Sequence, residues 1–200
     1  MKATTAKAIG ITGGIACGKS EVAKIFEDFG VPVLDTDCVA HDLMRAGEPV
    51  YEQIVKEFGK GILAESGEID RKKLGATVFK QDGRLERLND LVHPEVGRIW
   101  RDWLKAHLER GRSAAVIIPL LYEVNATEGW DAIITVAASP ERVLERLKGR
   151  GFVGSDAEAR ISAQWPLEKK IELADYVLEN SGSLEDLRIK AIQLLNQVLA

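Results

Sequence analysis

Four residues near the start of the chain have the spacing of a phosphate-binding loop. Gly13 is followed, after four further residues, by Gly18, Lys19 and Ser20. Glycines let the backbone curl so that successive N–H groups point at phosphate oxygens, and a helix beginning there adds the positive end of its dipole. The lysine of such a loop reaches the β- and γ-phosphates, and the serine hydroxyl can bind a bridging Mg²⁺. The pattern therefore predicts a site for a nucleoside triphosphate.

The flanking sequence favours this interpretation over a glycine-rich turn that binds nothing. A short apolar run, residues 8–11, precedes the motif. Apolar residues recur after it at helical spacing, at Val22, Ile25, Phe26 and Phe29. A strand, a loop and a helix in this order form the context in which a phosphate-binding loop works.

Two acidic residues, Asp35 and Asp37, follow the next predicted strand, residues 31–34. In an open α/β sheet the carboxyl ends of the strands face the bound ligand. A carboxylate there can accept a proton from an attacking hydroxyl or help to hold magnesium. The alternative is a helix cap for the segment that begins at Cys38. Beside a phosphate loop we favour chemistry, with Asp37 as the first candidate and Asp35 as the second.

Three arginines recur at every fourth residue, Arg142, Arg146 and Arg150, so one helix face carries three guanidinium groups. Arginines delivered by a closing lid can stabilise the negative charge of a migrating phosphoryl group. The alternative is a solvated face paired with Glu141 and Glu145. We favour the lid, because a lid is the expected companion of a phosphate loop.

The third predicted strand ends in a segment that should also face the ligand, Pro119-Leu120-Leu121-Tyr122-Glu123. Glu123 can bind a sugar hydroxyl or a cation there, and Leu121 and Tyr122 can form an apolar wall. The strand has no aspartate in the usual Walker-B place, so the pair after the second strand would take over that duty. His93-Pro94 is expected to break two helices and to leave His93 in a turn.

Composition excludes several classes of function. The formal net charge is −4, from 27 Lys and Arg against 31 Asp and Glu. With no basic excess, broad binding to nucleic acid or to a membrane surface is not expected. The first residues match neither a signal peptide nor an anchor, and no apolar run reaches transmembrane length. Cys17 and Cys38 form no CxxC pair, so we expect free thiols in a reducing cytosol. Cys17 also lies at a helix N-terminus, which can lower the pKa of a thiol.

Strands and helices alternate along the chain, which predicts an α/β fold with a parallel sheet covered on both faces. We expect one domain over residues 1–200, with a helical acceptor-binding insertion at 38–112 and a lid region at 139–168. Helix starts are predicted at Ser139, at Ser155 through a capping box with Glu158, and after Ser183. The expected strands are residues 8–12, 31–34, 114–118, 132–137 and 176–179.

Taken together, these motifs resemble the dephospho-coenzyme A kinase family. The match runs in order from about residue 8 to 182 and also includes Gln164, Lys169, Lys170 and residues 174–182. It implies a P-loop kinase fold: a five-stranded parallel core flanked by helices, with a helical acceptor-binding insertion and a helical lid. It also implies transfer of the ATP γ-phosphate to the ribose 3′-hydroxyl of dephospho-coenzyme A (dephospho-CoA), the last step of coenzyme A synthesis.

The resemblance also implies roles for individual residues. Asp37 would be the base, Lys19 and Ser20 would hold phosphate and magnesium, and Arg146 or Arg150 would act from the lid. The segment Asn180-Ser181-Gly182 would lie near the adenine. The implied ATP site comprises Gly13, Gly14, Ile15, Ala16, Cys17, Gly18, Lys19, Ser20, Glu21, Arg142, Asn180 and Gly182. The implied acceptor site comprises Thr12, Asp35, Asp37, His93, Leu121, Tyr122 and Glu123.

The chain departs from the family pattern at four positions. Ala16 and Cys17 stand where the family usually has Gly-Ser, and only their backbone N–H groups are needed. Glu21 replaces a frequent threonine, and an acid so close to the triphosphate would weaken ATP binding unless it points away. Glu179 stands where aspartate is frequent. The expected partners are ATP, Mg²⁺ and dephospho-CoA, and the protein is expected to be a cytoplasmic monomer or weak homo-oligomer.

Three other functions are less consistent with the sequence. Another small-molecule kinase is disfavoured only through the resemblance of the helical insertion and of residues 118–123. A GTP-dependent switch would carry an Asn-Lys-X-Asp motif and a DxxG segment, and the sequence has neither. A non-catalytic nucleotide-binding module would be expected to lose Lys19 or Asp37, and both are present.

Overall fold

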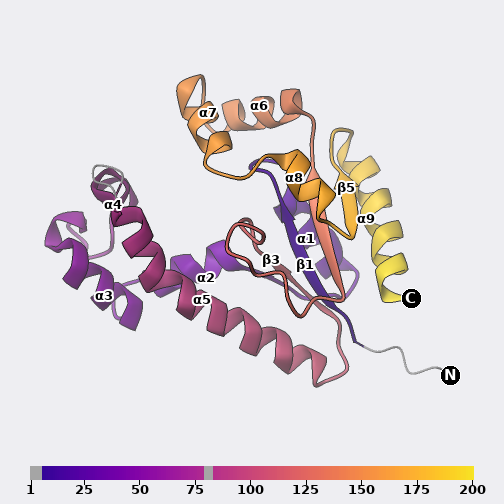
Figure 1. The fold of residues 1–200 in the computed structure, drawn as a ribbon, viewed down its shortest axis with the longest axis horizontal. Helices are drawn as coiled ribbons and strands as arrows, with labels where there is room; N and C mark the ends of the chain where they lie inside the picture. The colour runs from indigo at the N-terminus through magenta and orange to yellow at the C-terminus, as the bar shows by residue number, and fades with distance from the viewer. Residues whose placement is uncertain (1–5, 79–82) are drawn as a thin grey trace. The chain divides into compact units, whose positions relative to one another are not determined.

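The computed structural model describes residues 6–78 and 83–200, which divide into two compact units (Figure 1). The first unit contains the described residues of Met1–Asp35 together with Leu104–Ala200. The second contains the described residues of Thr36–Trp103. The phosphate-loop motif lies in the first unit, and Asp37 lies in the second.

The first unit is built on a five-stranded parallel sheet with the order β2-β3-β1-β4-β5. All five predicted strands are confirmed, with bounds that shift by two residues at most. The largest shift is at β2, where Val31 and Pro32 precede the strand, since proline has no N–H for the ladder. The strands are β1 (Ala8–Gly13), β2 (Val33–Asp35), β3 (Ala114–Ile117), β4 (Ala132–Ala137) and β5 (Tyr176–Glu179).

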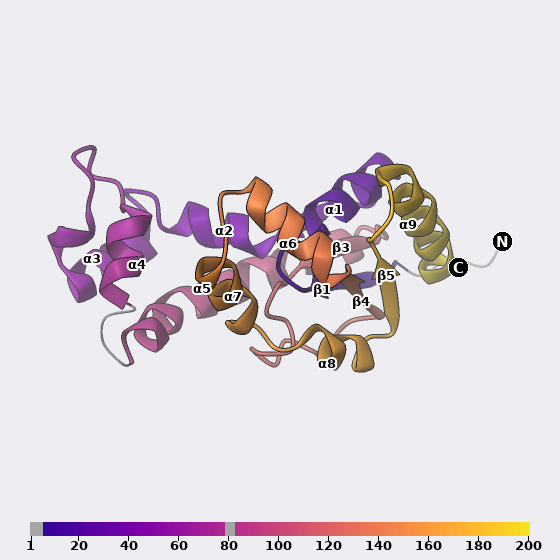
Figure 2. The same cartoon turned by 90° about the horizontal axis from the view of Figure 1, so that it is seen from above.

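The central strands β1, β3 and β4 are buried at every position, as expected for a parallel sheet that is covered on both faces. Helices α1 (Lys19–Asp28) and α9 (Leu184–Leu199) pack side by side over one face. Helix α8 (Leu167–Glu172) lies against β4 on the other face (Figure 2). The core between α1, α9 and the sheet includes Ile9, Ile11, Val22, Phe26, Ile134, Leu187 and Leu195.

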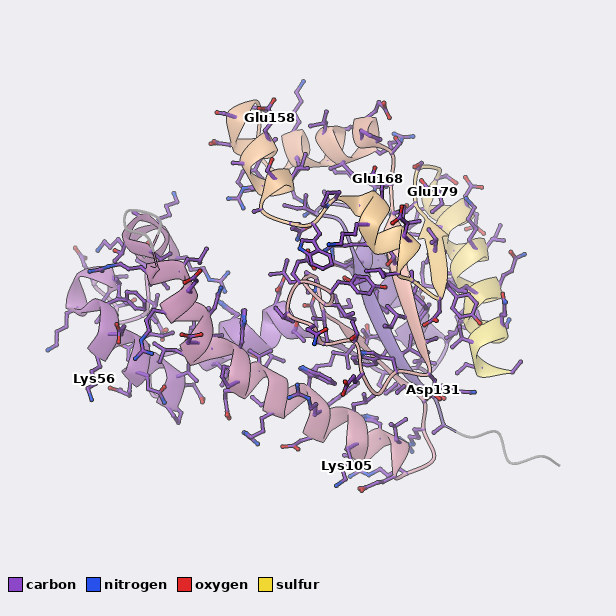
Figure 3. All side chains as sticks on the ribbon, in the orientation of Figure 1. Lys56, Lys105, Asp131, Glu158, Glu168 and Glu179 are labelled. Carbon is purple, nitrogen blue, oxygen red and sulfur yellow. The ribbon has the colours of Figure 1, made fainter. Side chains whose placement is uncertain are left out.

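The two ends of the sheet differ in chemistry. At the amino end, Asp131 Oδ2 accepts the Ala8 N–H at 2.7 Å, and Asp175 Oδ2 accepts the Ile133 N–H at 2.7 Å. Figure 3 shows Asp131 at this end and Glu179 at the opposite end. Because all strands run the same way, their carboxyl ends share the second edge, where the phosphate loop follows β1.

Helices α6 (Pro140–Gly149) and α7 (Ser155–Ser162) form the segment for which a lid was expected. The predicted cap at Ser139 is confirmed, because its side chain accepts the Arg142 N–H. The predicted capping box at Ser155 is wrong. Gly154, with φ of 54°, takes the N-cap position, so Ser155 is already the first helical residue and its side chain makes no capping bond.

A capping box is found instead at the start of α9. Ser183 Oγ accepts the Asp186 N–H at 3.1 Å, and Asp186 Oδ2 accepts the Ser183 N–H at 2.9 Å. These bonds satisfy N–H groups that a helix start leaves without an intrahelical partner. The terminal helix therefore begins at a fixed point, immediately after the end of β5 and its following turn.

The second unit is mostly helical, as the sequence predicts. Helix α5 (Arg84–Leu108) is continuous through Pro94 and extends into the first unit, so the predicted helix break at His93-Pro94 is wrong. Val92, Val96 and Trp100 recur at every fourth residue and are buried, and this burial outweighs the cost of an interior proline, about 3 kcal/mol. The other elements are α2 (Thr36–Leu43), α3 (Pro49–Phe58), the 3₁₀ helix η1 (Lys60–Ile62) and α4 (Arg71–Val78).

Within the described ranges, no helix has the length and apolar character needed to span a membrane.

The two serines provide a test of the helix boundaries. Ser183→Ala should lower the free energy of unfolding by about 1 kcal/mol, because it removes a capping bond from α9. Ser155→Ala is the matched control and should change it by less than about 0.5 kcal/mol. Urea denaturation followed by circular dichroism measures both. Equal losses in the two variants would contradict the assigned helix starts.

Candidate active site

The phosphate loop connects β1 to α1, and its two motif glycines are required by their surroundings. A Cβ atom on Gly13 would lie 2.1 Å from the Val136 carbonyl oxygen of β4. A Cβ atom on Gly18 would lie 2.1 Å from Asn180 Nδ2, and Gly18 also has φ of 99°. Both positions combine a positive φ with close approach, so no other residue fits without a shift of the loop.

Lys19 is the first residue of α1, and its side chain folds back over the loop. Its Nζ donates to the Gly13 carbonyl at 3.1 Å and to the Gly14 carbonyl at 2.9 Å. The ammonium group therefore lies against the backbone that the sequence predicts to hold phosphate. This position gives the loop a positive charge in addition to the N-terminus of α1. Ser20 follows it on the helix and is exposed.

Two side chains from distant parts of the sequence bind the outer carbonyls of the loop. Asn180 follows β5 and is buried, and its Nδ2 donates to the Cys17 carbonyl at 2.7 Å. Arg146 on α6 donates through Nη1 to the carbonyls of Ala16 at 3.1 Å and Cys17 at 3.3 Å. Its Nη2 donates to Asn180 O at 2.9 Å and Oδ1 at 3.2 Å. Arg146 and Asn180 therefore hold the loop from outside as one network.

The outer side of this network borders a pocket of about 160 Å³. Arg150 and Gly182, both predicted site residues, line it together with Arg146 and Asn180. Two leucines, which sequence reasoning missed, also line it: Leu184 and Leu187 of α9. The other lining residues are Ala16, Gly18 and Glu21. The pocket thus combines apolar side chains with guanidinium groups beside the phosphate loop.

Cys17 and Glu21 have ordinary environments, whereas Ala16 has a φ of 56°, in the left-handed region that favours glycine. Cys17 is buried, and this burial raises the pKa of its thiol despite the opposing charge of Lys19, so the lowering that a helix N-terminus can cause does not prevail. Glu21 Oε1 accepts from Lys24 Nζ at 2.8 Å in an exposed pair. Its charge is therefore partly balanced within α1.

Arg142, a predicted site residue on α6, donates to Ser181 O at 3.1 Å and to Glu145 Oε2 at 2.8 Å.

A fully buried lysine organises the end of β3. Lys170 Nζ, on α8, donates to the Pro119 carbonyl at 2.8 Å and pairs with Glu123 Oε1 at 2.7 Å. Thr12 Oγ1, on β1, donates to the same Pro119 carbonyl at 3.2 Å. Thr135 Oγ1, on β4, donates to the Lys170 carbonyl at 3.1 Å. The carboxyl ends of β1, β3 and β4 are thus joined through one lysine.

The local sequence predicts no role for Lys170, although Lys170 belongs to the motifs that resemble the family. A lysine next to Lys169 in a charged helical segment looks like a surface residue, since lysine is almost never fully buried unless it is paired. The only available signal was an acid on a strand end, Glu123, which needs a cation when it is buried. Leu121 and Tyr122 are buried beside it, and burial raises the pKa of Tyr122.

The acidic candidates flank the point in the sequence where the first unit ends and the second begins. Asp35 is the last residue of β2 and is half-buried. Asp37 is exposed in the first turn of α2, two residues further along the chain. His93 is exposed on α5 and also belongs to the second unit.

Comparison with known proteins identifies the family. A family model described as dephospho-CoA kinase matches residues 7–186. The chain belongs to the dephospho-CoA kinase family. The predicted activity is thereby confirmed: the protein is a kinase that acts on dephospho-CoA in the last step of coenzyme A biosynthesis.

Individual relatives agree over nearly the whole chain. A dephospho-CoA kinase from Carboxydothermus hydrogenoformans is 44% identical, with 94% of this chain and 93% of the relative covered. One from Geobacillus kaustophilus is 43% identical, with coverage of 94% and 95%. Among solved structures, a Thermus thermophilus protein has a TM-score of 0.82 at 35% identity, with 98% of each chain covered. Dephospho-CoA kinase from Campylobacter jejuni has a TM-score of 0.67 at 26% identity, with coverage of 97% and 98%.

The Lys170–Glu123 pair predicts a specific pattern of stability. Lys170→Met should lower the free energy of unfolding by about 3–5 kcal/mol, because it leaves the Glu123 carboxylate buried without its partner. The double variant Lys170→Met/Glu123→Leu should recover most of that loss, since apolar residues can replace a buried pair. Urea unfolding measures both. A double variant no more stable than the single one would contradict this account of the pair.

Proposed function

We propose that Asp37 is the base when this chain transfers the γ-phosphate of ATP to the ribose 3′-hydroxyl of dephospho-CoA. The hydroxyl oxygen forms a bond to the γ-phosphorus while the bond to the β–γ bridging oxygen breaks and ADP leaves. The hydroxyl proton passes to the Asp37 carboxylate. The observation that carries this proposal is a braced phosphate loop at the carboxyl edge of a sheet whose edge strand β2 leads directly into Asp37.

On the donor side, the loop backbone and Lys19 bind the β- and γ-phosphates. The Lys19 ammonium group already lies against the loop carbonyls of Gly13 and Gly14. Rotation about the side-chain bonds of Lys19 would move the ammonium group from these carbonyl oxygens to the oxygens of a bound triphosphate. The fixed N–H groups of the loop then stabilise the charge that develops on the β-phosphate as ADP leaves.

The pocket beside Asn180 would hold the adenine of ATP. Leu184 and Leu187 provide apolar contact for a base, and Arg146 provides a planar cation that can stack on it. Arg150, the C-cap residue of α6, lines the same pocket and is a candidate for contact with the phosphates. Arg146 has a second role, since its bonds to Ala16 and Cys17 fix the loop itself.

We propose that Mg²⁺ accompanies ATP. Magnesium prefers hard oxygen ligands and is usually bound through one or two protein oxygens together with phosphates and water. The Ser20 hydroxyl at the start of α1 and the Asp35 carboxylate at the end of β2 are ligands of this type. The ion would neutralise negative charge on the phosphates.

On the acceptor side, the exposed carboxylate favours Asp37 over Asp35 as the proton acceptor. An exposed group in the first turn of a helix can meet a ligand without moving the sheet. Glu123 is engaged by Lys170 and Leu121 is fully buried, so these residues would act by shaping the end of β3. Thr12 acts in the same way, since it bonds to Pro119.

One observation bears on the setting of the protein in the cell. Cys17 is a buried cysteine outside any disulfide, which is consistent with a reducing cytoplasm. We propose a cytoplasmic enzyme whose partners are its two substrates, working as a monomer or weak homo-oligomer.

Replacement of each aspartate tests the assignment of the base. Asp37→Asn should lower kcat for ADP release with dephospho-CoA at least about a hundredfold, because the amide cannot accept the proton. The Kd for ATP, measured by calorimetry, should stay within about twofold of wild type. Asp35→Asn is the comparison at the neighbouring position. Normal turnover by Asp37→Asn together with loss in Asp35→Asn would move the role to Asp35.

A further inference from the structure

The second unit contains a pocket of about 260 Å³ that has no role in the function proposed above. Three basic side chains line it: His41 from α2, Arg45 just after α2, and Arg71 at the start of α4. The Arg71 guanidinium group hydrogen-bonds to His41 Nδ1. The remaining lining residues are Met44, Glu68 and Ile69. Two guanidinium groups and an imidazole thus meet around a small open space.

Local bonds fix the walls of this pocket. Asp70 Oδ1 accepts the N–H groups of Lys72 at 2.9 Å and Lys73 at 3.1 Å, which caps α4 and sets Arg71 as its first residue. Glu68 Oε2 accepts the Ala46 N–H at 3.1 Å, which ties the loop after α2 to the segment before α4. Arg71 and Arg45 are therefore presented from two segments that a hydrogen bond between the Glu68 side chain and the Ala46 backbone holds together.

Glu68 Oε2 is engaged by the Ala46 N–H, and the Asp42 carboxylate near the pocket leaves Arg45 able to bind an anion. Arg45 pairs with Asp42 at 3.0 Å, with both side chains more than half exposed. An exposed pair of this kind contributes between about 0 and 1 kcal/mol, so a stronger ligand can replace it. Arg71 bonds to an imidazole nitrogen, which carries no negative charge. An arginine side chain can donate two parallel hydrogen bonds to a phosphate group, and these bonds are stronger than hydrogen bonds between uncharged groups.

One wall of the pocket lies on the same face of α2 as the proposed base, Asp37. Asp37, His41 and Arg45 are each four residues apart, so Asp37 and His41 share one face of α2 and Arg45 continues the series just beyond the helix. Residues at this spacing have Cβ atoms roughly 5–6 Å apart. The pocket therefore begins about one helical turn from Asp37.

We infer that this pocket binds the diphosphate group of dephospho-CoA. The inference rests on the proposed role of Asp37. In dephospho-CoA the reacting 3′-hydroxyl and the 5′-diphosphate belong to the same ribose. A carboxylate for the hydroxyl and a basic pocket one turn away match this arrangement. Arg71 and Arg45 would bind the diphosphate oxygens, and His41 would hold the Arg71 guanidinium group in place. The pocket would then distinguish dephospho-CoA from acceptors without a diphosphate.

Two single variants and one control test the inference. Arg71→Gln and Arg45→Gln should each raise the KM for dephospho-CoA about tenfold or more, since each removes a charge-assisted contact. The KM for ATP should stay within about twofold. Arg98→Gln is the control, because Arg98 lies on α5 and pairs with Glu95 and Asp102 outside the pocket. Initial rates of ADP release, with each substrate varied in turn, give these constants.

The possible outcomes separate the two proposals. A wild-type protein that does not release ADP with dephospho-CoA would contradict the proposed function itself. An active wild type whose Arg71→Gln and Arg45→Gln variants keep the wild-type KM for dephospho-CoA would overturn only the diphosphate pocket. The diphosphate pocket would also be overturned if the variants raised the KM for ATP as well as the KM for dephospho-CoA and had a lowered melting temperature. That result would indicate a structural role for the arginines. Arg45→Gln keeps the test valid if Arg71→Gln folds poorly, because Arg45 is exposed and its pair is a surface pair.

Discussion

The bonds from Asn180 and Arg146 to the carbonyls of the phosphate loop are the constraint on which the site depends. A phosphate loop must point its N–H groups inward, so its carbonyls point outward and need partners of their own. Here the carbonyls of Ala16 and Cys17 receive them from a buried amide and a guanidinium group. The loop shape is therefore set before a nucleotide binds, and binding need not supply the ordering free energy.

The same carboxyl edge is fixed from the other side of the sheet. Lys170 joins the ends of β3 and β4 through the Pro119 carbonyl, the Glu123 carboxylate and the Thr135 hydroxyl, and Thr12 of β1 donates to the same Pro119 carbonyl. Burial of its charge is tolerated because each ammonium contact is to an oxygen within hydrogen-bond distance. The phosphate loop therefore begins at the end of β1, which cannot shift independently of β3 and β4. Such rigidity is what a site needs if it is to hold reacting groups within a fraction of an ångström.

The sequence was sufficient for features with local causes. The five strands, the cap at Ser139 and the position of the phosphate loop depend on periodicity and spacing over a few residues. The sequence was insufficient where contacts between residues far apart in the chain determine the structure. Lys170 looked like a surface lysine because its partner lies 47 positions away, at Glu123. Pro94 signalled a helix end, yet tertiary burial of the apolar face of α5 keeps the helix continuous.

Calorimetric titration of ATP and Mg²⁺ into the Asn180→Ala variant tests most directly whether the loop is held from outside. The variant loses the donor to Cys17 and one acceptor of Arg146, so the loop should populate other conformations and the Kd for ATP should rise about tenfold or more. Asn196→Ala, an exposed position on α9, serves as the control. A correctly folded Asn180→Ala variant that binds ATP with the Kd of the wild type and of the control would contradict the account.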